Sequence, residues 1–147
     1  MRALLSTKPN EHAVHFSLLL LRILIAVVMG FYGFEKLKTF QEMANSDFWN
    51  KDINFLGLGG KVSLALTIFA ELFCSIFLLL GLFTRYSLVP LLICMGYIVV
   101  VLDKYKIVTS GEHGFELNHA FTYFVIYLCL FLSGPGKWSM DKLLFKK

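Results

Sequence analysis

Two charged residues lie inside segments that otherwise have the composition of membrane-spanning helices. Arg22 stands among leucines, isoleucines and valines, and Glu71 stands in the middle of a second apolar run. An ionised side chain at the centre of a bilayer costs about 2.5 to 3.5 kcal/mol on insertion scales, so each must face protein, water or a partner. Their opposite signs predict that they pair with each other. Such a pair either fixes which helices pack together or belongs to a site that handles a substrate or protons.

The chain as a whole has the composition of an integral membrane protein. Of its 147 residues 57% are hydrophobic, and the mean hydropathy is +0.69. Four apolar runs cover residues 16–34, 62–82, 86–102 and 117–133, each near the roughly 20 residues that a helix needs to cross the hydrocarbon. These runs are continuous, unlike the alternating strands of a membrane barrel. We therefore expect an all-α fold, a single four-span membrane bundle over residues 1–147, with the first run retained rather than cleaved as a signal.

The segment between the first two runs predicts a short helix at the outer membrane surface. Phe40, Met43, Ala44 and Phe48 recur at helical spacing, and Trp49 follows them. Tryptophan is enriched at the depth of the lipid headgroups, which suits an interfacial helix; an ordinary structured loop is the alternative. The polar residues 103–116 predict a second outer loop.

Basic residues indicate how the chain is oriented and what surrounds it. Four spans place both termini on one side, and the lysine-rich residues 142–147 together with Arg85 in a short turn favour the cytoplasm for that side. A pI near 9.0 is expected of a protein whose flanking lysines meet anionic lipid, and it requires no nucleic-acid partner. We expect a multi-pass protein of the bacterial cytoplasmic membrane, in contact with membrane lipids.

The polar residues of three runs each fall on one helical face, so that packing would enclose a polar interior. Lys36 and Glu116 lie near the outer ends of their runs, where we expect a second ion pair, and His119 lies beside them. The phenols of the third and fourth runs could line a pocket for a planar ligand such as a quinone, or could simply bond to backbone and serine. The candidate catalytic residues are Arg22, Glu71 and His119, and the candidate ligand-binding residues are Lys36, Tyr97, Glu116, Tyr123 and Tyr127.

Histidine and cysteine spacing argues against a metal or a dithiol site. His119 has no second histidine or Glu-x-x-His spacing near it, so we expect neither metal nor haem. Cys74, Cys94 and Cys129 all lie inside apolar runs and form no C-x-x-C pair. We expect them to behave as small apolar residues, with a disulfide between Cys74 and Cys94 as the alternative.

Several motifs together resemble the DoxX family of four-helix membrane proteins. They are Arg22 followed by Gly33-x-x-Lys36, Glu71 leading into Leu80-Gly81-Leu82-Phe83-Thr84-Arg85, Glu116 before the last run, and the closing segment Gly134-Pro135-Gly136-Lys137-Trp138-Ser139-Met140-Asp141. The chain departs from the usual family pattern at Tyr32, where histidine is common, and at Met140, where leucine is usual.

The resemblance implies a function connected with membrane redox systems. Similar proteins include a subunit of a membrane thiosulfate:quinone oxidoreductase and members linked to thiol and oxidative-stress systems. The chain lacks a redox motif and an intrinsic cofactor of its own, so we expect a quinone-linked or thiol/sulfur oxidoreductase-associated subunit that binds a small ligand, with a redox or membrane protein as partner. The alternatives are a non-catalytic assembly factor for other membrane or exported proteins and a small-molecule permeation protein.

The expected topology can be tested with reporter fusions. Reporters placed after Ser110 and after Lys147 should signal opposite sides of the membrane, because an odd number of spans separates the two positions if both termini are cytoplasmic. A fusion after Gly59 should match the one after Ser110. The same signal from Ser110 and Lys147 would contradict the four-span count.

Overall fold

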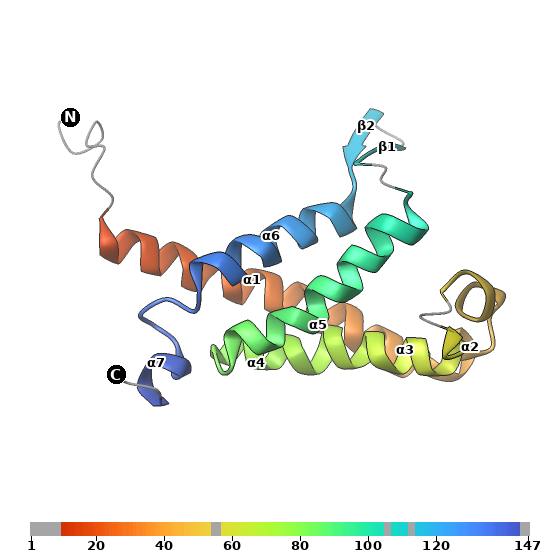
Figure 1. Ribbon diagram of the computed structural model, residues 1–147, viewed down its shortest axis with the longest axis horizontal. Coiled ribbons are helices and arrows are strands. Elements are labelled where there is room, and N and C mark those ends of the chain that lie inside the picture. The colour runs from red at the N-terminus through yellow and green to blue at the C-terminus, as the bar shows by residue number, and fades with distance from the viewer. Residues whose placement is uncertain (1–9, 54–56, 105–106, 112–113, 145–147) are drawn as a thin grey trace.

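The computed structural model describes residues 10–53, 57–104, 107–111 and 114–144, and it is built almost entirely of helices (Figure 1). The helices are α1 (Glu11–Lys38), α2 (Phe40–Ala44), α3 (Gly60–Ile68), α4 (Ser75–Leu80), α5 (Thr84–Tyr97), α6 (His119–Ser133) and α7 (Met140–Leu144). Three π-helical turns accompany them, namely η1 (Phe48–Asp52), η3 (Phe69–Cys74) and η4 (Ile98–Leu102). Strands β1 (Val108–Gly111) and β2 (Gly114–Leu117) form an antiparallel hairpin.

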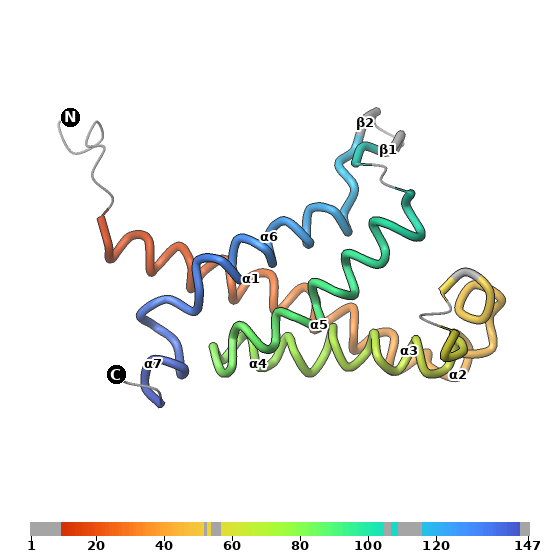
Figure 2. Tube along the Cα trace, viewed as in Figure 1, coloured from red at the N-terminus to blue at the C-terminus, as the bar shows by residue number. Residues whose placement is uncertain are grey.

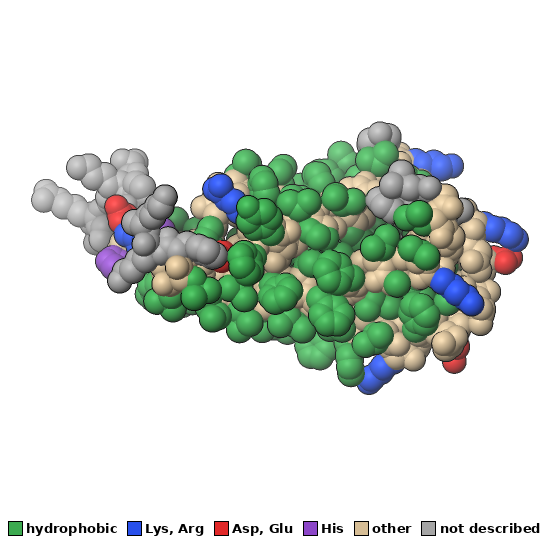
Figure 3. Space-filling model, turned by 60° about the horizontal axis from the view of Figure 1, so that its bottom comes forward, with side chains coloured by type: hydrophobic (Ala, Val, Ile, Leu, Met, Phe, Trp, Pro, Cys, Tyr) green, Lys and Arg blue, Asp and Glu red, His purple; other side chains and the backbone are tan. Residues whose placement is uncertain are grey.

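Three of the helical segments described by the structure are long and apolar enough to cross a membrane. They run through Glu11–Lys38, Gly60–Leu80 and Thr84–Leu102, the second and third of these being continued by π-helical turns. The shorter apolar helix α6 has 15 residues and packs against α5. Hydrophobic side chains cover the middle of the surface shown in Figure 3, and charged side chains gather toward its ends. The prediction of an all-α membrane protein is therefore confirmed.

The main core lies where α1, the α3–η3–α4 helix, α5 and α6 meet. Leu78, Leu88 and Leu91 are completely buried there, together with Met29 and Tyr127. Large apolar side chains such as Phe31 and Leu24 point outward instead and are mostly exposed. An apolar exterior around a packed interior is what a helix bundle presents to lipid.

The two ends of the bundle differ in what they carry. The beginning of α1 and helix α7 lie at one end, on the left of Figure 1, and α2 and the β-hairpin lie at the other. We call these the terminal end and the loop end. At the terminal end Lys137 forms an ion pair of 2.6 Å with Glu11. Part of the lysine-rich segment behind the expected orientation lies outside the described residues, namely Lys146 and Lys147.

At the loop end, the expected short helix is present as α2 followed by η1. Trp49 does not sit exposed at the surface; it is buried in a small second core with Leu64 and Ile68. Gly60 allows this packing, because a Cβ at that position would lie 2.6 Å from the carbonyl oxygen of Trp49. Backbone contact therefore fixes the loop to the beginning of α3.

The segment expected to be a second outer loop contains the β-hairpin instead. Val108 pairs with Leu117 and Thr109 pairs with Glu116 across its two strands. The Asn118 side chain then begins α6 by accepting a hydrogen bond of 3.1 Å from the backbone N–H of Phe121, and its amide donates to Asp103 over 2.8 Å. Side chain and backbone bonds together thus connect the end of η4 to the beginning of α6.

At the terminal end, the closing segment folds back beneath the turn between α4 and α5 (Figure 2). The backbone N–H of Asp141 donates to the carbonyl of Gly81 over 2.9 Å. The Asp141 carboxylate accepts hydrogen bonds from the backbone N–H groups of Phe83, over 2.5 Å, and Thr84, over 2.9 Å. The first N–H groups of a helix have no partner within the helix and favour a negative charge. Asp141 thus caps α5 from a distant part of the chain.

Removing this cap should destabilise the bundle. We expect Asp141→Ala to lower the free energy of unfolding by about 1 to 3 kcal/mol, because two backbone N–H groups lose a charged acceptor. Thermal unfolding in detergent measures the change.

Asp47→Ala is the matched control for this change. Its carboxylate is 83% exposed and pairs with the exposed Lys51, so the cost should stay below about 1 kcal/mol. Equal costs for the two variants would contradict the capping role of Asp141.

Candidate functional site

The site begins at a close contact between two helices. Gly33 of α1 lies directly against η3, where a Cβ would come within 2.7 Å of the Leu72 backbone nitrogen and 2.9 Å of the Glu71 carbonyl carbon. A side chain at this position would force the two helices apart. Glycine therefore allows the backbones to approach, as small residues do at membrane helix interfaces, and it brings the next turn of α1 beside Glu71.

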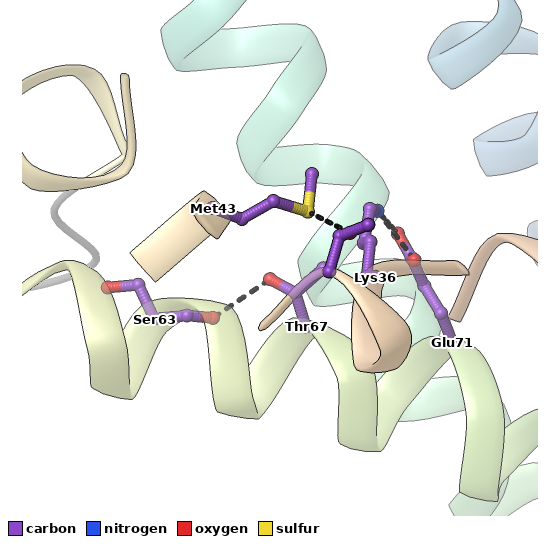
Figure 4. Close-up of polar contacts among 6 residues, drawn as sticks. Lys36, Met43, Ser63, Thr67 and Glu71 are labelled. Carbon is purple, nitrogen blue, oxygen red and sulfur yellow. Dashed lines mark hydrogen bonds and ion pairs between the residues drawn. The ribbon is translucent and has the colours of Figure 1, made fainter. Parts of the chain in front are cut away.

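Lys36, on that next turn, forms an ion pair with Glu71 (Figure 4). Its Nζ donates to Glu71 Oε1 over 2.5 Å and to Oε2 over 2.6 Å. The Glu71 side chain is 2% exposed and the Lys36 side chain is 22% exposed, so the carboxylate is enclosed while the ammonium reaches a surface. The predicted pairing of Glu71 with Arg22 is therefore wrong: the partner is Lys36.

A cavity of about 1070 Å³ lies beside Lys36, which lines it, whereas Glu71 is not among the lining residues. It lies between the loop-end segments α2 and η1, the helix α3–η3, and the helix α5–η4, which separate toward the loop end in Figure 1. All three π-helical turns contribute to its wall. Turns of this kind are frequent at functional sites. Its polar or charged lining residues are Lys36, Lys51, Ser63, Thr67, Cys94, Tyr97, Asp103 and Lys104.

The rim of the cavity has two chemical characters. Leu66, Phe69, Ile93 and Val101 belong to the lining and are also 43% to 53% exposed. Lipid-facing side chains thus form part of the rim, so the cavity is open toward the hydrocarbon. The lining also includes the charged residues Lys51, Asp103 and Lys104, which belong to the loop-end segments. An apolar volume with a few polar groups at one end suits an amphipathic ligand.

The surroundings of Glu71 inside the bundle are sparsely polar. The Cys94 thiol of α5 and the Tyr127 hydroxyl of α6 are close enough to interact with its charge. Tyr127 is completely buried, and its hydroxyl has no hydrogen-bond partner among the described residues. Thr67, one turn before Glu71, donates to the Ser63 carbonyl over 2.9 Å. The ion pair with Lys36 therefore supplies the strongest stabilisation that the Glu71 carboxylate receives.

Arg22 lies at the terminal end, where its contacts indicate a structural role. It is 2% exposed, and its guanidinium donates to the carbonyl of Pro135 over 2.7 Å and to the carbonyl of Trp138 over 2.8 Å. Gly81 leaves room for it, since a Cβ there would lie 2.7 Å from Arg22 Nη1. Arg22 thus fastens the closing segment to the bundle.

The other candidate residues lie away from the cavity, apart from Tyr97, which lines it. His119 is exposed at the first position of α6, and Glu116 is exposed on β2. The expected pair between Lys36 and Glu116 is wrong, because Lys36 binds Glu71. Tyr123 is partly buried on α6, where its hydroxyl meets that of Tyr32, and Tyr127 lies in the main core.

Neither a disulfide nor a metal cluster is formed by the described residues. Cys74, Cys94 and Cys129 are free thiols. In the described part of the chain, no three His, Cys, Asp or Glu side chains are grouped so that they could hold a metal ion. Cys94 nevertheless lines the cavity, a role that its position in an apolar run did not indicate. Lys51, Thr67 and Lys104 were also missed, because they are far apart in the sequence and only the folded chain brings them around one cavity.

Comparison with known proteins places the chain in a family. Residues 17–103, more than half of the chain, match the DoxX family. The protein is a member of the DoxX family. The match includes Gly33, Lys36 and Glu71 and ends before α6 and the closing segment. The resemblance noted from the motifs is thereby confirmed.

A relative from Mycobacterium tuberculosis extends the similarity over more of the chain. It is described as the uncharacterized membrane protein Rv3486 and is 29% identical over 143 residues, which cover 89% of this chain and 83% of the relative. No solved structure matches this chain. The relatives thus support a membrane protein of this family and assign it no reaction.

The coupling between Lys36 and Glu71 can be measured with a double-mutant cycle. Lys36→Met and Glu71→Leu should each lower the free energy of unfolding by roughly 3 to 5 kcal/mol, because each leaves a buried or half-buried charge without its partner. The double variant should lose much less than the sum. Thermal unfolding of the purified variants in detergent gives the three values.

A second cycle, between Arg22→Leu and Glu71→Leu, serves as the control. These two side chains have different partners, so their costs should add. Additive costs in the Lys36–Glu71 cycle would refute the pair.

Proposed function

We propose that this protein is a membrane-embedded binding subunit that takes an amphipathic, membrane-soluble ligand of the quinone class into the cavity beside Lys36. It would serve a quinone-linked or thiol/sulfur oxidoreductase system. The observation that supports this proposal most is the cavity itself: about 1070 Å³, with lipid-facing side chains and Lys36, the partner of Glu71, in its lining.

The size and shape of the cavity suit a ligand that arrives through the membrane. Small-molecule pockets usually measure about 300 to 1,000 Å³, so this one holds a ring and part of a hydrocarbon tail. The exposed rim formed by Phe69, Ile93 and Val101 gives the tail an apolar path to the lipid. A water-soluble substrate would not require an opening toward the lipid.

The donors in the wall fit the carbonyl groups of a quinone. An ammonium group carries three N–H donors, so Lys36 can bond a ligand oxygen while it remains paired with Glu71. Thr67 and Tyr97 line the same space. The Thr67 hydroxyl hydrogen is already given to the Ser63 carbonyl over 2.9 Å, so its oxygen would only accept from a ligand. A bound quinone would supply reversible acceptance of electrons and protons. The chain would bind and orient the ring and exclude water from it.

The residues assigned from sequence to charge handling change accordingly. Lys36 and Glu71 take that role, whereas Arg22 holds the closing segment and His119 is exposed away from the cavity. Tyr97 keeps its role in ligand binding. Tyr123 and Tyr127 are not among the residues that line the cavity.

Copurification and a thermal shift test the proposal. Protein purified from its native membrane should carry an isoprenoid quinone that mass spectrometry of an organic extract detects. A short-chain ubiquinone should raise the melting temperature, since a ligand at 100 times its Kd stabilises the folded state by about 2.7 kcal/mol. Lys36→Met should weaken this shift.

Lys38→Met is the matched control for the thermal shift. Lys38 belongs to the same helix, but it is exposed and lies over the Phe34 ring at 4.5 Å, so its loss should leave the shift unchanged. If quinones neither copurify nor stabilise the protein, and one stoichiometric membrane protein copurifies instead, the assembly-factor function replaces this proposal.

A further inference from the structure

The charges that line the cavity are unequal in sign. Lys36, Lys51 and Lys104 line it, against Asp103 alone among the acids of the described lining. The Asp103 carboxylate already accepts a hydrogen bond from the Asn118 amide over 2.8 Å. Two of these lysines already have acidic partners outside the lining, because Lys36 pairs with Glu71 and Lys51 pairs with Asp47, so the lining offers ammonium donors rather than a net positive charge. A space that is apolar toward the lipid and carries ammonium donors in its lining is suited to an amphiphile with an anionic headgroup.

Of the three lysines, Lys36 offers the strongest site for such a headgroup. Its Nζ is held in one place by Glu71, and its side chain is only 22% exposed. Lys51 is 72% exposed and pairs with the exposed Asp47, an arrangement worth roughly 0 to 1 kcal/mol. A charge pair becomes stronger as water is excluded from it. Lys51 and Lys104 therefore attract the anion to the cavity, and Lys36 binds it.

An anion at Lys36 changes the charge balance of the buried pair. The ammonium and the Glu71 carboxylate together are neutral, and a second carboxylate would leave one uncompensated negative charge where Glu71 is 2% exposed. An isolated ionised carboxylate in such surroundings becomes protonated rather than remaining charged. The other titratable groups facing Glu71, namely Cys94 on α5 and Tyr127 on α6, carry no positive charge that could replace Lys36.

From this geometry we propose that the cavity binds lipophilic carboxylic acids, each as an anion on Lys36 accompanied by one proton on Glu71. The balance is simple: R–COO⁻ and one H⁺ from water join the Lys36–Glu71 pair, giving R–COO⁻ on the Lys36 ammonium and a neutral Glu71 carboxylic acid. No covalent bond to carbon forms or breaks, and no electron moves. The proposal depends on the proposed function in one respect, that this cavity is a ligand site, and it names a second ligand class for it.

Calorimetry on the whole protein in lipid nanodiscs tests this directly. Decanoic acid is the probe, decanamide is its neutral equivalent, and a short-chain ubiquinone tests the quinone proposal in parallel. We expect decanoic acid to bind at least tenfold more tightly than decanamide near neutral pH. Titrations in two buffers of different ionisation enthalpy should show one proton taken up per acid bound. Affinity for the acid should rise about tenfold for each unit by which pH falls, over the range in which that proton is taken up.

Variants separate this binding mode from its alternatives. In Glu71→Gln the acid should still bind but proton uptake should vanish, because the amide keeps the shape and cannot accept the proton. Uptake that persists in Glu71→Gln would show that the acid enters in its own protonated form, which overturns the proposal. Lys36→Met should weaken acid binding at least tenfold, and Lys38→Met should leave it unchanged.

The comparison of acid and amide in the wild-type protein decides the matter even if a variant fails to fold. Acid and amide binding equally well would overturn the proposal. Quinone binding without acid binding would leave the proposed function standing and refute this inference. Binding of neither would refute both.

Discussion

The buried carboxylate of Glu71 is the constraint on which the loop-end half of the bundle depends. A charge that is 2% exposed in an apolar interior must be paired, and Lys36 near the end of α1 supplies the partner one turn after the two backbones come into close contact. Gly33 makes that contact possible, since its missing Cβ leaves room for the backbone of Glu71 and Leu72. The helix contact and the ion pair are therefore one feature: glycine brings the charges together, and the charges hold the helices at the distance that glycine allows.

Arg22 and Lys36 lie 14 positions apart on α1, or about 21 Å along its axis, and they fasten opposite ends of the bundle. Arg22 binds backbone carbonyls of the closing segment, and Asp141 of the same segment caps α5. Those contacts join three helices at the terminal end through hydrogen bonds to backbone atoms. The family match covers α1 through η4, which contain both charges of the Lys36–Glu71 pair, and it stops before the closing segment. The terminal end is thus joined through hydrogen bonds to backbone atoms, and the candidate ligand site lies at the loop end.

Sequence predicted the parts of this architecture that follow from hydropathy. Long apolar runs can only become helices in lipid, so the class of fold and the approximate helices were accessible, as was the short helix before Trp49. The partner of Glu71 was not. Helical periodicity places Arg22 and Lys36 on one face of α1, and both side chains are long enough to be considered as partners of Glu71. The periodicity does not show that Arg22 instead donates to the carbonyls of Pro135 and Trp138. The hairpin was missed because Val108 to Leu117 is polar and glycine-containing. The cavity was missed because its wall comes from seven elements, namely α1, α2, η1, α3, η3, α5 and η4.

The cavity exists because α3–η3 and α5–η4 separate toward the loop end, and local backbone features accompany this separation. Pro90 lies inside α5 and lines the cavity; it has no N–H to donate to the preceding turn, a common cause of helix bending. The π-helical turns η3 and η4 face each other across the same space and widen their helices locally. Such departures from regular helix cost stability and would serve no purpose in a bundle that only had to pack. Their concentration around one lysine-bearing cavity, together with a lipid-facing rim, is the physical argument that this end of the protein binds a ligand.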